Sequence, residues 1–344
     1  MINPDVSLVL CTVRPSQAYA NHPEWDAIGK VCVDLANQID APPFELVIVD
    51  GLHGRRQPTP IWNGVCGASM APIRHIPPRA GSPWVRMRKI AIAAYRNTGI
   101  AAARGELIVN LDDACELPPN FVSTFWNTWR ETGTAAAMIW PDKGDRREPG
   151  PLPDEQFAYG FSSYPRELLL SINGYDEAYD GGKGLEDMDM STRVRAAGLR
   201  QTLVALPGFD QGSAQTGHAS EAIDPVRPIC KCCNQAWNTE RVWRHVVVAN
   251  RADLWTREAL ERLVGPCRML DGERCGHHQG RYRCAYYDDQ RLPAVPDSSD
   301  TESETCAPGY TEARSFARHL DPEAAVVFDE PPVVDLRELA KEYR

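Results

Sequence analysis

The sequence places two adjacent carboxylates, Asp112 and Asp113, directly after a short apolar run at residues 106–111. Such a run is typical of a buried strand, and open α/β sheets bind ligands at the carboxyl ends of their strands. Hard divalent cations such as Mg²⁺ and Mn²⁺ prefer carboxylate oxygens and usually complete their coordination with phosphate oxygens. The pair therefore predicts a divalent-metal site, and the simpler alternative is a solvated loop at a strand end.

A second acidic cluster consists of Glu186, Asp187 and Asp189, and it follows the glycine-rich residues 181–184. The helix dipole favours acidic side chains in the first turn of a helix, so the cluster needs no catalytic explanation. Its functional interpretation is a general base, which has to reach a substrate hydroxyl and hold its charge in a cleft.

The elements that must position these carboxylates alternate between strand and helix. Apolar runs predict buried strands at residues 7–12, 45–49 and 106–111, and helical spacing predicts helices at residues 24–39 and 85–104. Parallel strands need a crossover connection and become buried on both faces. We therefore expect an α/β fold with a mostly parallel sheet and flanking helices.

Further elements are expected along the next hundred residues. The patterns predict helices at 120–131, 166–172 and from 185 to Gly198, a strand at 135–140, an extended segment at 157–164 and a turn at 173–177.

The composition is that of a globular protein. It is 43% hydrophobic and 24% charged, with 37 Lys and Arg against 47 Asp and Glu, a net charge of −10. These values exclude collagen-like, wholly disordered and strongly basic classes. No apolar stretch approaches the roughly 20 residues that span a bilayer, and the first residues lack a signal-peptide pattern, so we expect no membrane span and a cytoplasmic location.

Five segments, in this order, resemble the GT-A glycosyltransferases, most closely the family 2 and galactosyltransferase-like enzymes that use nucleotide sugars. The segments are SLVLCTVRPS, ELVIVDG, YRNTGI before Ala103-Arg104-Gly105, LDDACELPPNF and INGYDEAYDGGKGLEDMDMSTRVRAAGLR. They span about residues 7 to 200, somewhat over half of the chain. The resemblance implies the GT-A fold, which is Rossmann-like with a mostly parallel sheet, and a nucleotide-sugar donor.

The resemblance also implies roles for residues of the donor site. Thr12 to Arg14 and Asp50 would contact the nucleoside, and Arg96 would contact the base or phosphate of the donor. Asp112 and Asp113 stand where the family carries its metal-binding D-x-D motif, but Ala114 occupies the position of the second carboxylate. Either Asp113 replaces it, or metal binding is weaker and shared with Glu116.

Two further roles follow from the same resemblance. Asp187, within Glu186-Asp187, matches the catalytic base of inverting members, and His218 lies where many such enzymes place a late metal ligand. A lone histidine is more often structural. Direct displacement with Asp187 as base predicts inversion at the anomeric carbon, and Mn²⁺ or Mg²⁺ with a basic side chain would stabilise the leaving diphosphate.

Cysteines and histidines gather in residues 225–291, beyond the expected glycosyltransferase domain at 1–224. Zinc needs four thiolate or imidazole ligands, often as a close C-x₂-C pair and a second pair further on. Cys230, Cys233, Cys275 and Cys284 fit a structural zinc, and Cys232, Cys267, His277 or His278 could substitute. The alternative is a set of reduced, buried cysteines.

The same region has 12 Lys and Arg against 8 Asp and Glu, with aromatic residues interleaved. Its simpler interpretation is an amphipathic helix at 239–264. The alternative is a platform for the acceptor, because aromatic and arginine faces stack on sugars or bases. The acceptor would then be a glycan or DNA with hydroxymethylated bases, which must be flipped out of a duplex.

Residues 292–344 are expected to form an acidic linker and a tail with a helix at 333–343. For the whole chain, the main alternative to an enzyme is a non-catalytic sugar- or nucleotide-binding module with a degenerate metal motif, which Ala114 motivates.

Overall fold

The structure is a computed structural model that describes part of the chain. The described residues are 3–13, 18–19, 22–54, 70–82, 85, 91–113, 115–139, 147–153, 158, 161–180, 185–207, 248–250 and 334–343.

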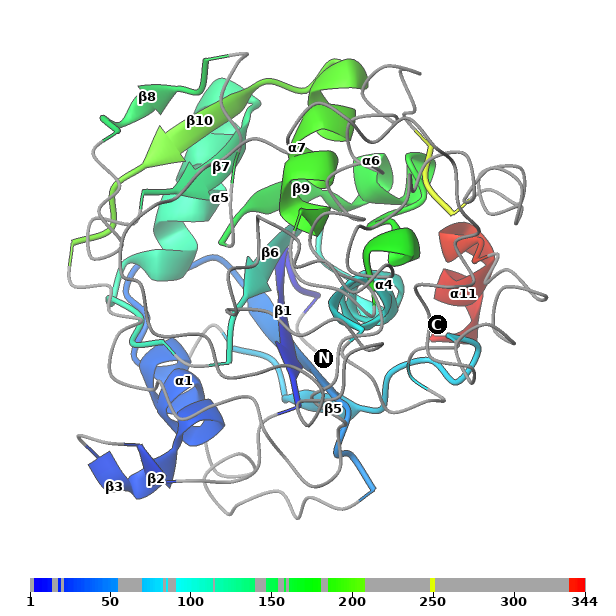
Figure 1. The fold of residues 1–344 in the computed structure, drawn as a ribbon. Coiled ribbons are helices and arrows are strands. Elements are labelled where there is room, and N and C mark those ends of the chain that lie inside the picture. Colours follow the sequence, from blue (N-terminus) through cyan, green and yellow to red (C-terminus); the bar gives the residue numbers. More distant parts are fainter. Residues whose placement is uncertain are drawn as a thin grey trace, which may run out of the picture.

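A mainly parallel sheet forms the centre of the molecule (Figure 1). Its strands, in spatial order, are β5 (Arg74–Ile76), β4 (Phe44–Asp50), β1 (Val6–Thr12), β6 (Leu107–Leu111) and β9 (Ser163–Pro165). Only β9, at the edge, runs antiparallel to its neighbour among these five. The three central strands are the predicted apolar runs, which confirms the expected α/β class.

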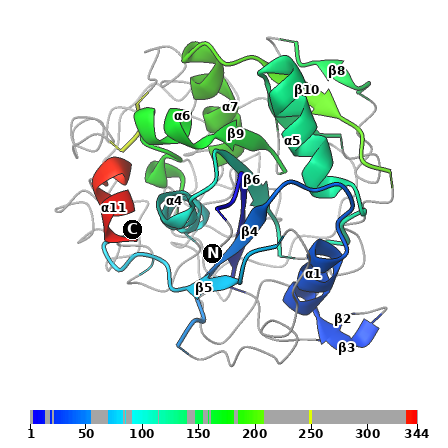
Figure 2. The same ribbon diagram turned by 180° about the vertical axis from the view of Figure 1, so that it is seen from behind.

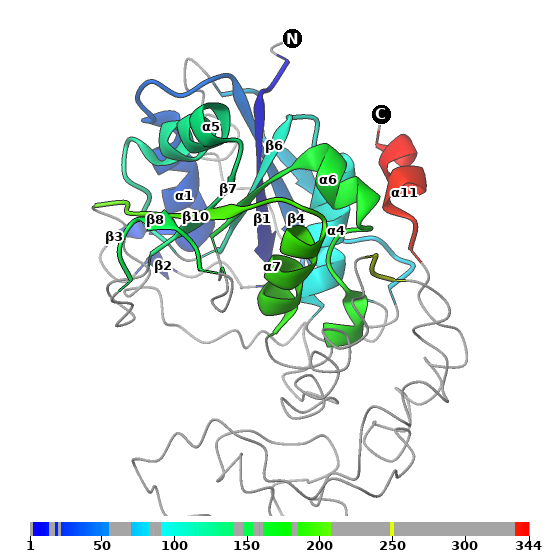
Figure 3. The ribbon, with the colours of Figure 1, turned by 90° about the horizontal axis from the view of Figure 1, so that it is seen from above.

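Helices cover both faces of this sheet, as the view from above shows (Figure 3). The helices α1 (Ala27–Ala36) and α5 (Phe121–Thr132) pack on one face. The helices α4 (Ile92–Ala102) and α6 (Arg166–Ser171) pack on the other. Each face of the sheet therefore has its own hydrophobic core. The side chains of β1 alternate between them: Leu8 and Leu10 belong to the first core, with α1 and α5, and Val9 belongs to the second core, with α4 and α6.

A smaller sheet adjoins the first and consists of β7 (Ala135–Met138), β10 (Gln201–Val204) and β8 (Gly150–Pro151). In the sequence, the short helix η2 (Glu177–Tyr179) and the helix α7 (Glu186–Ala196) lie between β9 and β10. The first residues of α7 are the second acidic cluster.

The C-terminal helix α11 (Leu336–Glu342) lies beside α4 (Figure 2). Its buried residues Leu336, Leu339 and Ala340 belong to the same core cluster as Ala93 and Ile100 of α4. The helix predicted at 333–343 is thereby confirmed, and it packs on the α/β core.

Three helix predictions are wrong in part. The helix expected at 85–104 is interrupted at Ala91, which is not helical and directly precedes α4. The helix expected at 24–39 begins only at Ala27, because His22–Asp26 forms strand β3, which pairs with β2 (Ala18–Tyr19). The helix expected at 239–264 cannot run through its middle, since Asn250 has the left-handed φ of +54° and Val248 to Asn250 are not helical.

No helix within the described ranges has the length and apolar character to cross a membrane. Cys32 and Cys115 are buried free cysteines, and Cys11 is a half-buried one. The zinc candidates Cys230, Cys233, Cys275 and Cys284 lie outside the described residues.

Candidate active site

The carboxyl ends of β1, β4 and β6 meet at one edge of the sheet. Thr12 ends β1 opposite Asp50 at the end of β4, and Asp112 follows the last residue of β6. The Thr12 hydroxyl donates to Oδ2 of Asp113 at 2.7 Å. Asp113 is buried and Asp112 is half-buried. The two adjacent carboxylates therefore differ in environment, and Asp113 is tied to the neighbouring strand.

Arg96 comes to this edge from helix α4. Its Nη1 lies 3.3 Å from Oε1 of Glu186, at the start of α7, and its guanidinium lies 4.8 Å from the ring centroid of Tyr175. Burial lowers the pKa of the Arg96 guanidinium, but electrostatic interactions with neighbouring titratable groups raise the pKa overall. These groups are the hydroxyl of Tyr175 and the carboxyl groups of Glu186, Asp187 and Asp112. The two acidic clusters of the sequence thus share one buried cation.

Glu186 carries a perturbed carboxyl group. Burial, together with the charge of Asp187, raises its pKa from 4.5 to about 7, and Arg96 opposes the rise. Such perturbed carboxyl groups are typical of sites that hold or move protons. Leu185, just before the helix, has a left-handed φ of +81°, so the chain turns sharply as it delivers Glu186 and Asp187.

The side chain of Asp50 is fully buried and its two oxygens accept hydrogen bonds from the protein. The backbone amide of Leu52 donates to Oδ1 at 2.8 Å, and Nε2 of His75 lies 2.9 Å from Oδ2. His75 comes from β5, paired with Ile48 of β4. Sequence reasoning did not identify His75, because only the sheet register brings it to Asp50.

Tyr175 is a second residue that sequence reasoning did not single out. Its ring lies beneath Arg96, and its hydroxyl accepts a hydrogen bond from Nδ2 of Asn110 in β6 at 2.9 Å. The tyrosine stands in the segment INGYDEA, which the resemblance already included, but its contact with Arg96 depends on how α4 crosses the sheet.

Glu116, the alternative partner for a metal, forms an ion pair with Lys30 of α1 at 3.8 Å. Lys30 also binds Asp34 at 2.6 Å, and Asp34 accepts from the backbone amide of Leu117 at 2.9 Å. In the structure, Glu116 therefore contributes to the contacts that join α1 to the loop after Asp113.

Among the described residues, no group of three or more His, Cys, Asp or Glu side chains is arranged to hold a metal ion. The candidates Arg14 and His218 and the motif position Ala114 lie outside the described residues. The structure does bring together the others around one sheet edge: Thr12, Asp50, Arg96, Asp112, Asp113, Glu186 and Asp187.

Two family models match this part of the chain. Residues 86–180 match the model described as glycosyl transferase family 2. Residues 149–214 match the model described as the N-terminal domain of galactosyltransferase. Residues 86–214 are therefore similar to glycosyltransferases of these two families. The matched residues include Arg96, Asp112 and the start of α7, which lie together at the sheet edge.

Solved structures of S. aureus TarS are among the proteins that this chain is similar to. The complex of TarS 1-349 with UDP is 13% identical with a TM-score of 0.47, and the match covers 81% of this chain and 75% of that one. The complex of TarS 1-349 with UDP-GlcNAc is 13% identical with a TM-score of 0.48, covering 80% and 75%. Among curated proteins, none matches the chain significantly.

Proposed function

We propose that the glycosyltransferase domain moves a sugar from a nucleotide-sugar donor to an acceptor hydroxyl, with inversion at the anomeric carbon. The observation that carries the proposal is the position of Arg96. This buried cation contacts Glu186 at 3.3 Å and is electrostatically coupled to both Asp112 and Asp187. It thereby joins the expected donor side of the site, at β6, to the expected base at the start of α7.

The proposed chemistry is a single displacement. The acceptor oxygen forms a bond to the anomeric carbon while the bond from that carbon to the diphosphate oxygen breaks. The electron pair of the broken bond leaves with the nucleoside diphosphate, and the acceptor proton passes to the Asp187 carboxylate. Arg96 offsets part of the negative charge that builds on the diphosphate.

Asp112, Asp113 and His218 are the proposed ligands of Mn²⁺ or Mg²⁺ in the donor site. A bound divalent cation would neutralise charge on the donor's diphosphate. The half-buried Asp112 suits this role better than Asp113, whose Oδ2 already accepts from Thr12. Donor phosphates would complete the coordination.

Release of nucleoside diphosphate tests the enzyme proposal. The wild type is incubated with Mn²⁺ and, in turn, UDP-GlcNAc, UDP-glucose, UDP-galactose and GDP-mannose, with water as the acceptor. We expect turnover of at least one donor and a loss of about 100-fold or more in Asp187→Asn, because general-base catalysis contributes at least about that factor. Asp40→Asn, at an exposed position, is the control and should keep wild-type turnover.

The alternative function is a binding module without catalysis. It would be supported if the wild type bound UDP or GDP but turned over none of the four donors, and that result would overturn the enzyme proposal. Chelation tests the role of the metal on its own. We expect EDTA to abolish the increase in melting temperature that UDP or GDP produces. An increase that EDTA does not diminish would contradict the role given to Asp112.

Two proposals concern residues 225–291. A structural zinc held by Cys230, Cys233, Cys275 and Cys284 predicts about one equivalent of zinc in the purified protein. Binding of the acceptor by this basic region predicts, if the acceptor is DNA, an affinity that falls steeply with salt because phosphate contacts release counterions. Binding that does not depend on salt would favour a glycan acceptor.

A further inference from the structure

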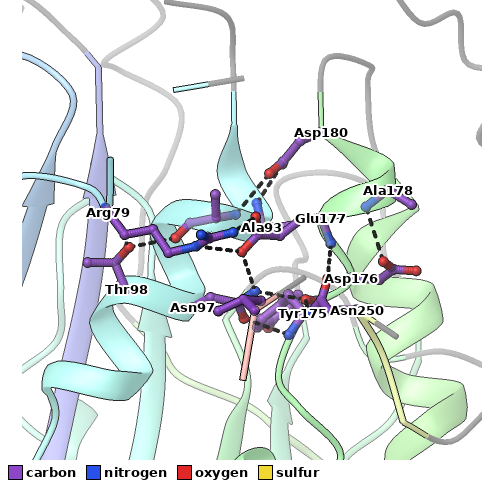
Figure 4. A network of polar contacts seen from close by, with 12 residues as sticks. Arg79, Ala93, Asn97, Thr98, Tyr175, Asp176, Glu177, Ala178, Asp180 and Asn250 are labelled. Atoms are coloured by element: carbon purple, nitrogen blue, oxygen red, sulfur yellow. Dashed lines mark hydrogen bonds and ion pairs between the residues drawn. The ribbon is translucent and has the colours of Figure 1, made fainter. Parts of the chain in front are cut away.

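The turn at residues 173–180, between α6 and α7, is joined to α4 and to Asn250 by a network of polar contacts (Figure 4). It carries Tyr175, whose ring lies beneath Arg96, and it ends at Asp180. The two oxygens of Asp180 accept from the backbone amides of Ala93 and Ala94 at 2.8 and 2.9 Å, and so hold the first turn of α4. Arg96 lies two residues after Ala94 on α4. Its position therefore depends on two contacts with the segment at 173–180: the Tyr175 ring beneath it, and the bonds from Ala93 and Ala94 to Asp180.

Asn97 of α4 fixes the turn from one side. Its Nδ2 donates to the carbonyl of Tyr175 at 2.8 Å, and its Oδ1 accepts from the amide of Tyr175 at 2.8 Å. Nδ2 also lies 3.0 Å from Oε1 of Glu177, a fully buried carboxylate that pairs with Arg79. Asn97 belongs to the motif that carries the resemblance, so this side could be anticipated.

Asn250 fixes the turn from the other side, and it lies beyond both matched segments. Its side chain, with the residue 1% exposed, makes three hydrogen bonds to the backbone of the turn. Oδ1 accepts from the amide of Glu177 at 2.9 Å, and Nδ2 donates to the carbonyls of Asn173 and Tyr175 at 2.9 and 2.8 Å. The carbonyl of Tyr175 is thus held between two asparagine amides.

We propose that Asn250 is a positioning residue for sugar transfer, acting through Tyr175 and Arg96 on Glu186 and Asp187. The inference rests on the proposed function. The path consists of contacts already described: Asn250 holds the backbone of Tyr175, the Tyr175 ring supports Arg96, and Arg96 binds Glu186 at 3.3 Å. Of the proposed donor-site residues, Arg96 lies on this path, whereas Thr12, Asp112 and Asp113 come from β1 and from the end of β6.

The backbone of Asn250 makes a clean substitution possible. Its φ of +54° is a conformation that glycine adopts without strain, so Asn250→Gly removes the three hydrogen bonds and keeps the backbone. Asp40 has nearly the same φ, +53°, at an exposed position, and Asp40→Gly is the matched control. Asn250→Ser is a second variant, because its hydroxyl brings no charge into this buried position and can still form one hydrogen bond with the turn.

The experiment measures turnover and binding separately on folded protein. With a donor that the wild type hydrolyses, we expect Asn250→Gly to lower kcat about 10- to 100-fold, because small misplacement of catalytic groups has effects of that size. The Kd for UDP or GDP should rise by a smaller factor than kcat falls, because Arg96 is only one of the proposed contacts with the donor. Asn250→Ser should show a smaller loss of kcat and a smaller rise of Kd, and Asp40→Gly should match the wild type in both.

Three results would overturn the inference. One is a kcat within about threefold of the wild type in Asn250→Gly, or in Asn250→Ser if the glycine variant does not fold. Another is a loss of nucleotide affinity as large as the loss of kcat, which indicates general loosening instead of positioning. Absence of turnover in the wild type would overturn the proposed function and this inference together, whereas the first two results leave the proposed function intact.

Discussion

At the scale of single residues, Thr12 and Asp113 show how the site accommodates a buried carboxylate. An ionised group away from water is costly unless hydrogen bonds replace its hydration. The Thr12 hydroxyl, itself buried, donates one such bond at 2.7 Å across two neighbouring strands. The bond also fixes the residue next to Asp112, so the stability of the fold and the geometry of the proposed donor site depend on the same contact.

Replacing Thr12 by valine keeps the shape of the side chain and removes the donor. We expect Thr12→Val to lower the free energy of unfolding by about 1.5–3 kcal/mol, the range for a hydrogen bond to a charged group. Thr12→Ser, which keeps the hydroxyl, should lose only about 0.8 kcal/mol for one buried methyl group. Urea unfolding measures both, and equal stability of the two variants would contradict the importance of the bond.

Glu186 predicts a specific pH dependence. Its pKa rises from 4.5 to about 7 on folding, so the folded state holds the proton more tightly than the unfolded state. The stabilisation is therefore complete below about pH 4.5 and is lost as the pH rises to about 7. We expect the free energy of unfolding of the wild type to fall, relative to Glu186→Gln, across this interval.

The measurement is urea unfolding at several pH values between 4 and 8. Glu131→Gln, on the exposed end of α5, is the control, and its curve should run parallel to that of the wild type. If the Glu186→Gln curve also ran parallel to the wild type, the raised pKa of Glu186 would be refuted.

The sequence identified most of the candidate site at this scale. Thr12, Arg96, Asp112 and Asp187 all gather at one edge because strand ends and helix starts of an α/β fold meet there. His75 and Tyr175 could not be predicted as site neighbours. Their contacts depend on the register of β5 beside β4 and on the crossing of α4, which apolar periodicity does not reveal.

At the scale of elements, the close contact between α4 and β1 fixes the position of α4 on the sheet. This position matters for the candidate site because α4 carries both Arg96 and Asn97. A Cβ at Gly99 would lie 2.2 Å from Cγ1 of Val9, in the middle of β1. Only a residue without a side chain lets the helix approach the sheet so closely. Gly99 therefore sets the distance between α4 and β1, and with it the distance of Arg96 from the sheet.

Alanine at Gly99 tests this contact. Alanine favours a helix over glycine by about 1 kcal/mol, but overpacking of a core costs about 1–3 kcal/mol. We expect Gly99→Ala to lower the free energy of unfolding on balance, and the added substitution Val9→Ala to relieve part of the clash. Gly54→Ala, with nothing within 4 Å of the new Cβ, should change stability by about 0.5 kcal/mol or less.

The strands were predicted more accurately than the helix ends. The strands β1, β4 and β6 are continuous apolar runs buried along almost their whole length, a signal that needs no tertiary information. The start of α1 was missed because residues 22–26 pair with β2 despite their helical spacing. A two-stranded pairing of this kind has no signature in the period of the apolar residues.

At the scale of the whole molecule, segments from far along the chain complete the second core. Leu336 of α11 is fully buried in the same cluster as Val9 and Tyr175. Asn173, just before Tyr175, donates to the carbonyls of Ala249 and Val334 and accepts from the amide of Leu336. Contacts across more than 160 residues leave no local trace, so the sequence could not predict this closure.

Truncation of Leu336 tests how far the core depends on α11. We expect Leu336→Ala to lower the free energy of unfolding by about 2–5 kcal/mol, as for other fully buried leucines. Arg337→Ala is the matched control on the same helix, where a half-exposed ion pair with Glu167 should contribute about 0.5 kcal/mol or less. Thermal or urea unfolding measures both, and equal effects would show that α11 contributes little to the core.

The hydrogen bond from Leu336 to Asn173 also orders events during synthesis. Asn173 leaves the ribosome 163 residues before its partner, and Gly174 packs against Leu336. Until Leu336 emerges, Asn173 lacks the hydrogen bond from the amide of Leu336, and the packing of Leu336 beside Gly174 is not formed. A nascent chain that stops before Leu336 would therefore hold the glycosyltransferase motifs but lack the finished support beneath Tyr175, so activity should appear only after synthesis has passed that residue.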